Sequence, residues 1–274
     1  MEVKQIKKKV IIFTDLDETL LKENKYYYYI LNNFIKTLLK KEYEIIPVTS
    51  KTYFEVIDVL KQIKYKLPFS VENGAAYYIP AKDKHNYQYK KILNPYALKR
   101  ENIKKIFNEN PFKKNINNIE FIENLPFLKI KKITKLNYNQ LENFKSREYT
   151  VPILWKGDKR LKNEFKTTLL KYNLKITFGG KLSNISGLHS KVDSMNFFTN
   201  QYKVKFRTKK IITISLGDSQ NDIEILNNSN YSGIVKGDSD NILNLYKKNN
   251  IFRSFTGAPH GWVEVLKKIL IKME

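Results

Sequence analysis

Short apolar runs alternate with stretches of helical periodicity through roughly the first eighty residues of the chain and again through roughly the last eighty. The apolar runs are bounded by turn residues and predict strands at 10–13, 44–48, 76–79, 211–216, 231–235 and 251–255. The periodic stretches predict helices at 26–40, 52–63, 223–226 and 261–271. Strands that alternate with helices in this way favour an α/β fold with a mostly parallel sheet.

The middle of the chain, at about 81–188, differs from both ends. It is richer in Asn and Lys, contains isolated prolines and has weaker strand signals. A helix at 165–172 and a strand at 174–178 are expected there, followed by a Gly179-Gly180 turn. This change of composition predicts an insertion.

Composition limits the classes of protein to which the chain can belong. It has 274 residues, 42% of them hydrophobic, which is enough for one large domain or two smaller ones. The absence of Cys excludes a disulfide framework, a thiol nucleophile and Cys-ligated metal centres. The apolar run at 10–13 is too short for a signal peptide or a membrane span, so we expect a cytoplasmic protein with no membrane partner.

The chain is strongly basic, with 50 Lys and Arg against 27 Asp and Glu and a formal net charge of +23. Such a charge is a reason to consider a nucleic-acid partner. The lysines, however, recur along the whole chain beside many Asn, Ile and Tyr residues, as a general coding bias would produce. Diffuse charge is typical of a solvated surface, and no nucleic-acid partner is expected.

The strand predicted at 10–13 ends in the acidic segment Thr14-Asp15-Leu16-Asp17-Glu18-Thr19. Parallel α/β sheets bind ligands beyond the carboxyl ends of their strands, which is where Asp15 is expected. Two carboxylates two positions apart in a loop can turn toward one ligand, one to attack it and the other to handle a proton. By itself the segment also fits a turn cap or the Asp-x-Asp metal site of nucleotide-sugar glycosyltransferases. A calcium loop is a further alternative, although the segment lacks the other ligands and the glycine of that motif.

A second acidic segment, Gly217-Asp218-Ser219-Gln220-Asn221-Asp222, follows the strand predicted at 211–216. Two acidic loops at two strand ends would collect four carboxylates, and such crowding is costly unless a divalent cation offsets it. Oxygen donors with no Cys or well-placed His favour Mg²⁺ over zinc.

Two further polar residues stand at the ends of expected elements. Ser50 follows the strand at 44–48 at the start of a helix, whose free N–H groups suit phosphate oxygens, although Ser50 alone also fits a simple N-cap. Lys191 lies just before a helix expected to begin near Asp193, where its ammonium could pair with a phosphoryl group. Alone, Lys191 would be interpreted as a solvated surface lysine in a chain with so many lysines.

In their order and context, four segments resemble the motifs of the haloacid dehalogenase (HAD) superfamily of phosphotransferases. They are Asp15-Leu16-Asp17-Glu18-Thr19, Thr49-Ser50, Lys191, and Gly217-Asp218 with Asn221-Asp222. The insertion resembles the type IIB cap of that superfamily. The resemblance implies an α/β fold with a Rossmann-like, doubly wound, mostly parallel sheet as a core at 1–81 and 189–274, and an inserted α+β cap at 82–188.

Within the superfamily, several segments are similar to the mannosyl-3-phosphoglycerate phosphatase family. They are 47–52, Glu72-Asn73-Gly74-Ala75, Arg147-Glu148, Pro152-Ile153-Leu154-Trp155, Gly179-Gly180-Lys181 and 256–262. Lys181 stands where the family usually has Arg, and Asn184 stands where an aromatic or His neighbourhood is expected. This resemblance implies a phosphatase that converts mannosyl-3-phosphoglycerate or glucosyl-3-phosphoglycerate into the glycosylglycerate, a compatible solute.

The resemblance also implies roles for the motif residues. Asp15 would attack the phosphoryl group and form an aspartyl-phosphate, and Asp17 would protonate the leaving alkoxide and later activate water. Asp15, the Asp17 backbone carbonyl and Asp218 would hold Mg²⁺, while Asp222 would ligate it or orient a ligated water. Phosphoryl oxygens would be bound by Ser50 and Lys191.

Recognition of the phosphorylated sugar-glycerate is expected from a further set of residues: Lys51, Glu72, Asn73, Gly74, Arg147, Lys181 and Asn221. Arg147 and Lys181 would supply cations for the substrate, unless they form surface salt bridges instead. Asn73-Gly74 also fits an ordinary turn. Two other functions stay open: a related type IIB sugar-phosphate phosphatase with another substrate, and a basic nucleic-acid-binding module.

Overall fold

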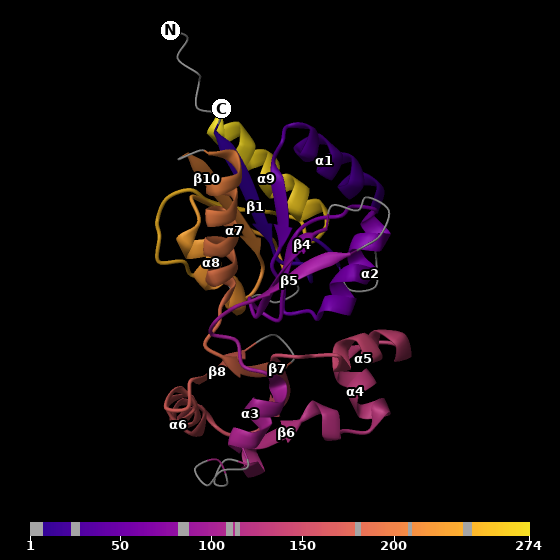
Figure 1. Cartoon of the computed structure of the whole chain (residues 1–274), viewed down its shortest axis with the longest axis vertical. Helices are drawn as coiled ribbons and strands as arrows, with labels where there is room; N and C mark the ends of the chain where they lie inside the picture. The colour runs from indigo at the N-terminus through magenta and orange to yellow at the C-terminus, as the bar shows by residue number, and fades with distance from the viewer. Residues whose placement is uncertain are drawn as a thin grey trace.

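The computed structural model describes residues 8–22, 28–81, 88–107, 112, 116–178, 182–207, 210–237 and 243–274. The chain forms two bodies, which Figure 1 draws one above the other. Within the described ranges, no helix has the length and apolar character that crossing a membrane requires.

A five-stranded parallel sheet forms the centre of the upper body (Figure 1). Its order is β12-β11-β10-β1-β2, and every neighbouring pair is parallel. The strands are β1 (Lys9–Thr14), β2 (Glu44–Pro47), β10 (Ile211–Gly217), β11 (Tyr231–Ile234) and β12 (Ile251–Arg253). The predicted parallel α/β architecture is therefore confirmed.

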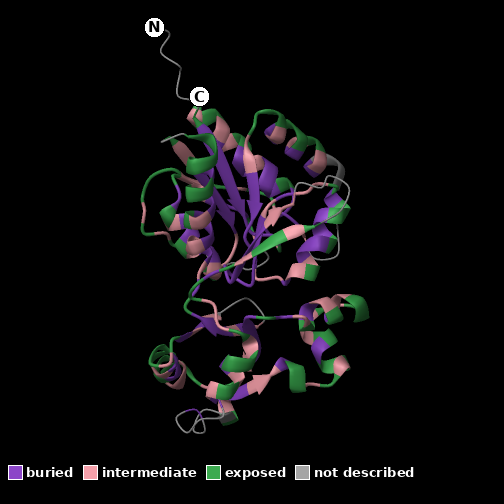
Figure 2. Cartoon of the chain, in the orientation of Figure 1, coloured by how far each residue is buried: buried purple, intermediate pink, exposed green. Residues whose placement is uncertain are grey.

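Helices cover both faces of this sheet. Alternate residues of a strand point to opposite faces, so Val10 and Ile12 of β1 pack with α1, α2 and α9, whereas Ile11 and Phe13 pack with α7 and α8. Figure 2 shows the buried strands between these helices. The helices are α1 (Tyr28–Lys40), α2 (Tyr53–Ile63), α7 (Lys191–Phe206), α8 (Ile223–Asn228) and α9 (His260–Met273).

Pro47 is the last residue of the edge strand β2. Immediately after it the pairing changes, because Val48 forms an isolated parallel bridge with Ser70. Proline cannot donate a ladder hydrogen bond, and an edge position tolerates that loss.

The bridge at Ser70 leads into a three-stranded antiparallel sheet with the order β3-β4-β5. Its strands are β3 (Phe69–Val71), β4 (Ala76–Pro80) and β5 (Tyr89–Leu93). β5 falls inside the segment predicted as the insertion, yet it pairs with β4 from Ala76↔Leu93 to Pro80↔Tyr89. The boundaries of the two domains stay a prediction.

The lower body is built on a four-stranded antiparallel sheet with the order β6-β7-β9-β8. The helices α3 and α6 pack on one face of it, and α4 and α5 form a separate apolar cluster. An α+β insertion is confirmed, although the sequence predicts only α6 and β8 within it. The elements are α3 (Arg100–Phe107), β6 (Ile119–Phe121), α4 (Phe127–Thr134), α5 (Tyr138–Lys145), β7 (Thr150–Trp155), α6 (Lys159–Leu170), β8 (Leu174–Phe178) and β9 (Ser183–Gly187), with short 3-10 turns η2 (Ile116–Asn118) and η3 (Ile122–Asn124).

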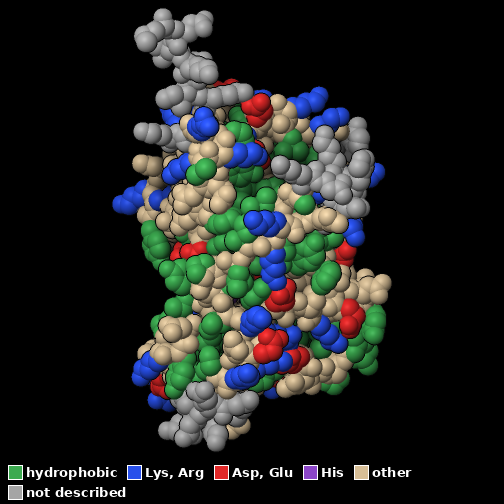
Figure 3. All heavy atoms as spheres, viewed as in Figure 1, with side chains coloured by type: hydrophobic (Ala, Val, Ile, Leu, Met, Phe, Trp, Pro, Cys, Tyr) green, Lys and Arg blue, Asp and Glu red, His purple; other side chains and the backbone are tan. Residues whose placement is uncertain are grey.

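Basic side chains do not gather on the face of the molecule that Figure 3 draws. Lys and Arg are spread over both bodies there and are interleaved with acidic and apolar side chains (Figure 3). This distribution is that of a solvated surface rather than of a phosphate-binding stripe.

Candidate active site

Three carboxylates meet at the carboxyl edge of the parallel sheet. Asp15 follows β1 and Asp218 follows the neighbouring strand β10, while Asp222 ends the short 3-10 turn η4 (Gln220–Asp222). The three carboxylates each contribute one oxygen to a group in which these atoms all lie within 4.8 Å of one another. Parallel neighbours end at the same edge, so residues far apart in the sequence come together there.

Lys191 is the cation of this cluster. Its Nζ lies 3.2 Å from Oδ1 of Asp15 and 2.6 Å from Oδ1 of Asp222. It is the first residue of α7, and Ser190 and Asp193 form the capping box, so the helix begins slightly before its predicted start. Burial alone would lower the pKa of the Lys191 ammonium, but Asp15 and Asp222 raise it above its ordinary value.

The carboxylates outnumber the positive charge available to them. Burial raises the pKa of Asp15 to about 7; Lys191 opposes this shift and Asp222 adds to it. Burial also raises the pKa of Asp218 to about 8, and the Asp222 and Asp15 carboxylates act in the same direction. All the donor atoms are carboxylate oxygens, so the set fits a hard divalent cation that would offset the crowded negative charge.

Asp17 does not join the carboxylate cluster. Its side chain is 57% exposed, and its Oδ2 lies 2.9 Å from Nζ of Lys51. Among the described residues three carboxylates gather, rather than the four that the sequence predicts. Lys51 also lies 3.9 Å from Glu55, so this lysine joins the first acidic loop to α2.

Two residues shape the cluster although the sequence gives them no role in it. Thr19 is fully buried, and its hydroxyl donates a hydrogen bond of 2.6 Å to Oδ1 of Asp218, which ties the two acidic loops together. At Gly217 an added Cβ would lie 2.4 Å from Cβ of Asp222, so only glycine fits there. The only signal for Thr19 was its place in the first motif.

Ser50 does not cap α2. The cap is Thr52, which forms a capping box with Glu55, so the alternative interpretation of Ser50 as an N-cap is wrong. Ser50 is partly buried, and its carbonyl accepts a hydrogen bond of 3.0 Å from Nη1 of Arg147. Two residues before Ser50, the Val48 N–H donates a hydrogen bond to the Thr14 carbonyl at the end of β1.

Arg147 belongs to the lower body, and its side chain reaches Ser50 of the upper body. Its Nη1 also donates to the Thr150 hydroxyl at 3.1 Å, and its guanidinium carbon lies 4.3 Å from the centre of the Phe144 ring. The side chain is buried, and Nε has no hydrogen-bond partner among the described residues. The alternative of a surface salt bridge for Arg147 is therefore wrong.

The turn after β3 joins the two bodies through Glu72. Its carboxylate is buried and accepts hydrogen bonds from the backbone N–H groups of Glu148 and Tyr149, at 2.9 and 3.0 Å, and from the Thr150 hydroxyl at 2.6 Å. The same side chain is predicted to bind sugar hydroxyls, and that role stays a prediction.

The next two residues of this turn are tightly held. Asn73 is buried with φ of 59°, and its Oδ1 has no hydrogen-bond partner within the described part of the chain. Gly74 has φ of 99°, and an added Cβ would lie 2.0 Å from the Ser190 carbonyl oxygen. The turn thus packs directly against the segment that carries Lys191.

Two predicted binding residues remain, Asn221 and Lys181. Asn221 lies in η4 beside the cluster, and its Oδ1 accepts a hydrogen bond of 2.5 Å from the Ser219 hydroxyl. Lys181 lies outside the described residues.

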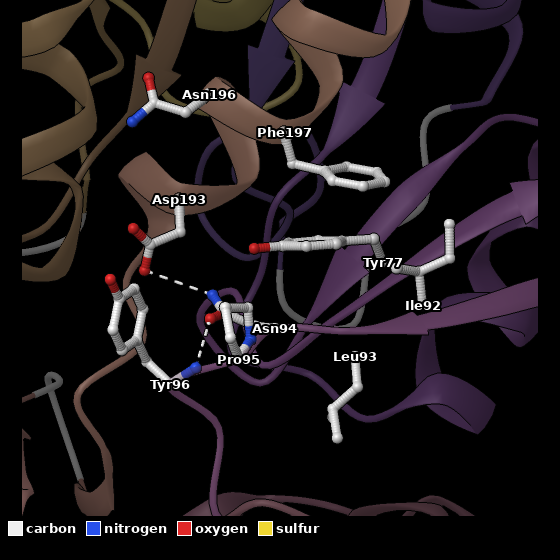
Figure 4. Close-up of a pocket in the computed structure, with 9 residues that line it drawn as sticks. All are labelled: Tyr77, Ile92, Leu93, Asn94, Pro95, Tyr96, Asp193, Asn196 and Phe197. Carbon is white, nitrogen blue, oxygen red and sulfur yellow. Dashed lines mark hydrogen bonds between the residues drawn. The ribbon is translucent and has the colours of Figure 1, made fainter.

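A cavity of about 380 Å³ lies away from the carboxylates, beside the connections between the two bodies. Figure 4 shows the stacked rings of Tyr77 and Phe197 on one side of it and Asp193 with Asn94 on another. The Asn94 amide donates to Asp193 at 3.3 Å and to the Gly74 carbonyl at 2.9 Å. These bonds hold the connection after β5 against the beginning of α7.

Comparisons with known proteins agree with this geometry. Residues 12–249 match the family described as haloacid dehalogenase-like hydrolase. Over 275 residues the chain is 27% identical to the glucosyl-3-phosphoglycerate/mannosyl-3-phosphoglycerate phosphatase of Persephonella marina, covering 97% of this chain and 98% of that protein. Over 228 residues it is 30% identical to the protein of the same name from Methanococcoides burtonii, covering 80% and 81%.

The fold is also similar to that of the sucrose-phosphatase of Synechocystis, solved in complex with sucrose and phosphate. The TM-score is 0.64 at 14% sequence identity, covering 96% of this chain and 98% of that one. At this identity the likeness concerns the fold alone.

Proposed function

Because the chain belongs to the haloacid dehalogenase-like hydrolase family, we propose that it is a Mg²⁺-dependent phosphatase of mannosyl-3-phosphoglycerate or glucosyl-3-phosphoglycerate. The products are the glycosylglycerate and phosphate. The observation that carries the proposal is the cluster of Asp15, Asp218 and Asp222 around Lys191 at the sheet edge. The names of the two relatives support the choice of substrate.

Asp15 is the nucleophile in this proposal. Its carboxylate attacks the phosphorus atom, the bond to the glycerate oxygen breaks, and an aspartyl-phosphate forms. Lys191, 3.2 Å from Asp15, and the partly buried Ser50 bind the phosphoryl oxygens, where negative charge must be stabilised in the transition state.

Asp17 is the proton donor and acceptor. Its exposed carboxylate protonates the leaving alkoxide and then takes a proton from the water that hydrolyses the aspartyl-phosphate. The ion pair with Lys51 must be exchanged for substrate contacts before this transfer, since it occupies Oδ2 of Asp17.

The carboxylates of Asp15 and Asp218 fit a Mg²⁺ ion. The Asp17 backbone carbonyl would complete this set of ligands, and Asp222 would ligate the ion or orient a ligated water. When bound, it reduces the repulsion between the anionic nucleophile and the anionic phosphate. Thr19 keeps Asp218 in position through its hydrogen bond.

Residues 82–188 act as the cap in this proposal, and 1–81 with 189–274 as the catalytic core. The segment from Arg147 to Thr150 contacts both Ser50 and Glu72, so it closes one side of the site. Lys51, Glu72, Asn73, Gly74, Arg147, Lys181 and Asn221 are the proposed binding residues for the rest of the substrate.

The test is phosphate release with Mg²⁺ from a panel of esters. We expect strong preference for mannosyl- or glucosyl-3-phosphoglycerate over 3-phosphoglycerate and simple hexose phosphates, and loss of activity with EDTA. Activity on simple sugar phosphates alone would keep the chemistry and reject the substrate. Salt-dependent RNA binding without any phosphatase activity would reject both.

A further inference from the structure

The sheet of the lower body has one polar face. In an antiparallel sheet directly paired residues lie on the same face. Lys175 pairs with Ser186, which pairs with Thr150, and Thr177 pairs with Asn184. These five residues therefore share a face, while the apolar residues that alternate with them form the core under α3 and α6.

This polar face is turned toward the catalytic residues. Thr150 donates its hydroxyl hydrogen bond to Glu72 of the upper body, and β8 contacts η4, which carries Asn221 and Asp222. Figure 1 shows β7 and β8 on the side of the lower body that meets the upper one, with α3 and α6 beyond them.

Lys175 is a cation on this face that has no close anionic partner among the described residues. It is partly buried, and it forms no ion pair with a carboxylate of the described residues, the acidic groups that act on it being the more distant Glu224 and Asp193. Burial lowers its pKa, while the more distant Glu224 and Asp193 carboxylates raise it. A cation that is partly removed from water is stabilised by an anion, and within the described part of the chain none is in direct contact with Lys175.

Asn184 lies on the same face, opposite Thr177, and its side-chain oxygen lacks a hydrogen-bond donor among the described residues. Its Oδ1 is inaccessible to solvent and accepts no hydrogen bond from any described residue. A buried acceptor of this kind needs a donor such as a hydroxyl group. Arg147 gives Nη1 to Ser50 and Thr150, although its Nε, like Asn184 Oδ1, has no partner among the described residues.

We propose that Lys175 pairs with the carboxylate of the substrate and that Asn184 Oδ1 accepts a hydrogen bond from one of its hydroxyls. This inference rests on the proposed function and specifies how its substrate is recognised. Lys175 selects for the glycerate acid, while Asn184 contributes to binding whether or not that acid is charged. Neither residue takes part in the transfer of the phosphoryl group.

The experiment measures binding rather than turnover. Asp15→Asn protein with Mg²⁺ is titrated calorimetrically with glucosyl-3-phosphoglycerate and with its carboxylate methyl ester, which has nearly the same shape without that charge. We expect the acid to bind about 10- to 100-fold more tightly than the ester. Adding Lys175→Met should abolish this difference, Lys175→Arg should retain most of it, and the exposed control Lys171→Met should leave it unchanged.

Two further titrations separate the sources of binding. Inorganic phosphate should bind Lys175→Met as it binds the parent, because Lys175 is assigned to the carboxylate. Asn184→Ala should weaken acid and ester alike, by about tenfold, since both keep their hydroxyls. If Lys175→Met weakens the binding of acid and ester equally, or leaves both unchanged, the assignment of Lys175 is wrong. If Asn184→Ala binds both as the parent does, the assignment of Asn184 is wrong.

Failure of the proposed function gives a different result. If the parent binds phosphate but neither glycosyl ester, the proposed substrate is wrong. The comparison is then made with 3-phosphoglycerate and glycerol 3-phosphate, which differ at the carboxylate. Lys175 keeps its assignment if Lys175→Met removes the preference for the acid, and loses it if the preference persists or was never present.

Discussion

At the scale of single residues, Asp15 is both the proposed nucleophile and one of three crowded carboxylates. It is buried beside Lys191 and two other carboxylates. We expect Asp15→Asn to lower phosphatase kcat by roughly 10³-fold or more, because the amide is not a nucleophile. The free energy of unfolding without metal should not fall, since the change removes one of three crowded negative charges.

Both quantities are measured on the same preparation, by phosphate release and by urea unfolding. The control is Glu101→Gln, an exposed carboxylate on α3, which should alter neither quantity. Activity of Asp15→Asn near that of the parent would contradict the nucleophile assignment.

His189 makes stability depend on pH. Burial lowers its pKa to about 4, and the nearby Lys175 acts in the same direction. Its Nε2 lies 3.0 Å from the Glu72 carbonyl oxygen, so the neutral ring donates there. Between the ordinary pKa near 6.5 and about 4 the unfolded chain binds the proton more readily, so stability falls as the pH is lowered through this range.

The predicted loss from this one group is about 3 kcal/mol between pH 7 and pH 4. His189→Gln should remove that part of the pH dependence, as measured by urea unfolding at several pH values. Parallel pH curves for the two proteins would show that His189 is not the responsible group.

At the scale of elements, the contact between the β3–β4 turn and the start of β7 holds the two bodies together. Three donors from 148–150 converge on the Glu72 carboxylate. We expect Glu72→Ala to cost about 3 kcal/mol, because it leaves buried donors without an acceptor. Hydrogen exchange at the amides of Glu148 and Tyr149 should accelerate in parallel.

Glu72→Gln keeps one acceptor oxygen and should lose less stability than Glu72→Ala. Glu142→Gln on α5 is the exposed control, since this carboxylate is 54% exposed. Unchanged amide exchange in Glu72→Ala would mean that the contact does not hold β7.

At the scale of the whole molecule, the proposed metal joins the loops that follow β1 and β10, which are neighbours in the sheet but far apart in the chain. A ligand that binds only the folded protein stabilises it by about 2.7 kcal/mol at one hundred times its Kd. We therefore expect Mg²⁺ to raise the midpoint of thermal unfolding, and Asp218→Asn to reduce that rise. Calorimetric scans with Mg²⁺ and with EDTA provide the measurement, and an absence of any shift in the parent would contradict the metal site.

Local patterns were sufficient for the parallel core. The apolar runs of β1 and β10 are continuous because both faces of those strands are buried, and the helix that begins after Thr52 is marked by its own capping residues. Asp15 and Asp218 could be predicted as neighbours because each follows such a strand, and strands of one parallel sheet end at one edge.

Only the tertiary structure decided how the remaining residues are used. β5 has little apolar pattern and is a strand because β4 pairs with it. Asp17 forms an ion pair with Lys51, and the Glu72 carboxylate accepts a hydrogen bond from Thr150 of β7. The polar face that carries Lys175 arises from the register of β8 with β9. The sequence by itself thus determined the elements of the parallel core and the sheet edge where Asp15 and Asp218 meet, since burial and capping act over a few neighbouring residues. The partners of exposed or charged side chains depend on long-range pairing, which no short window of sequence records.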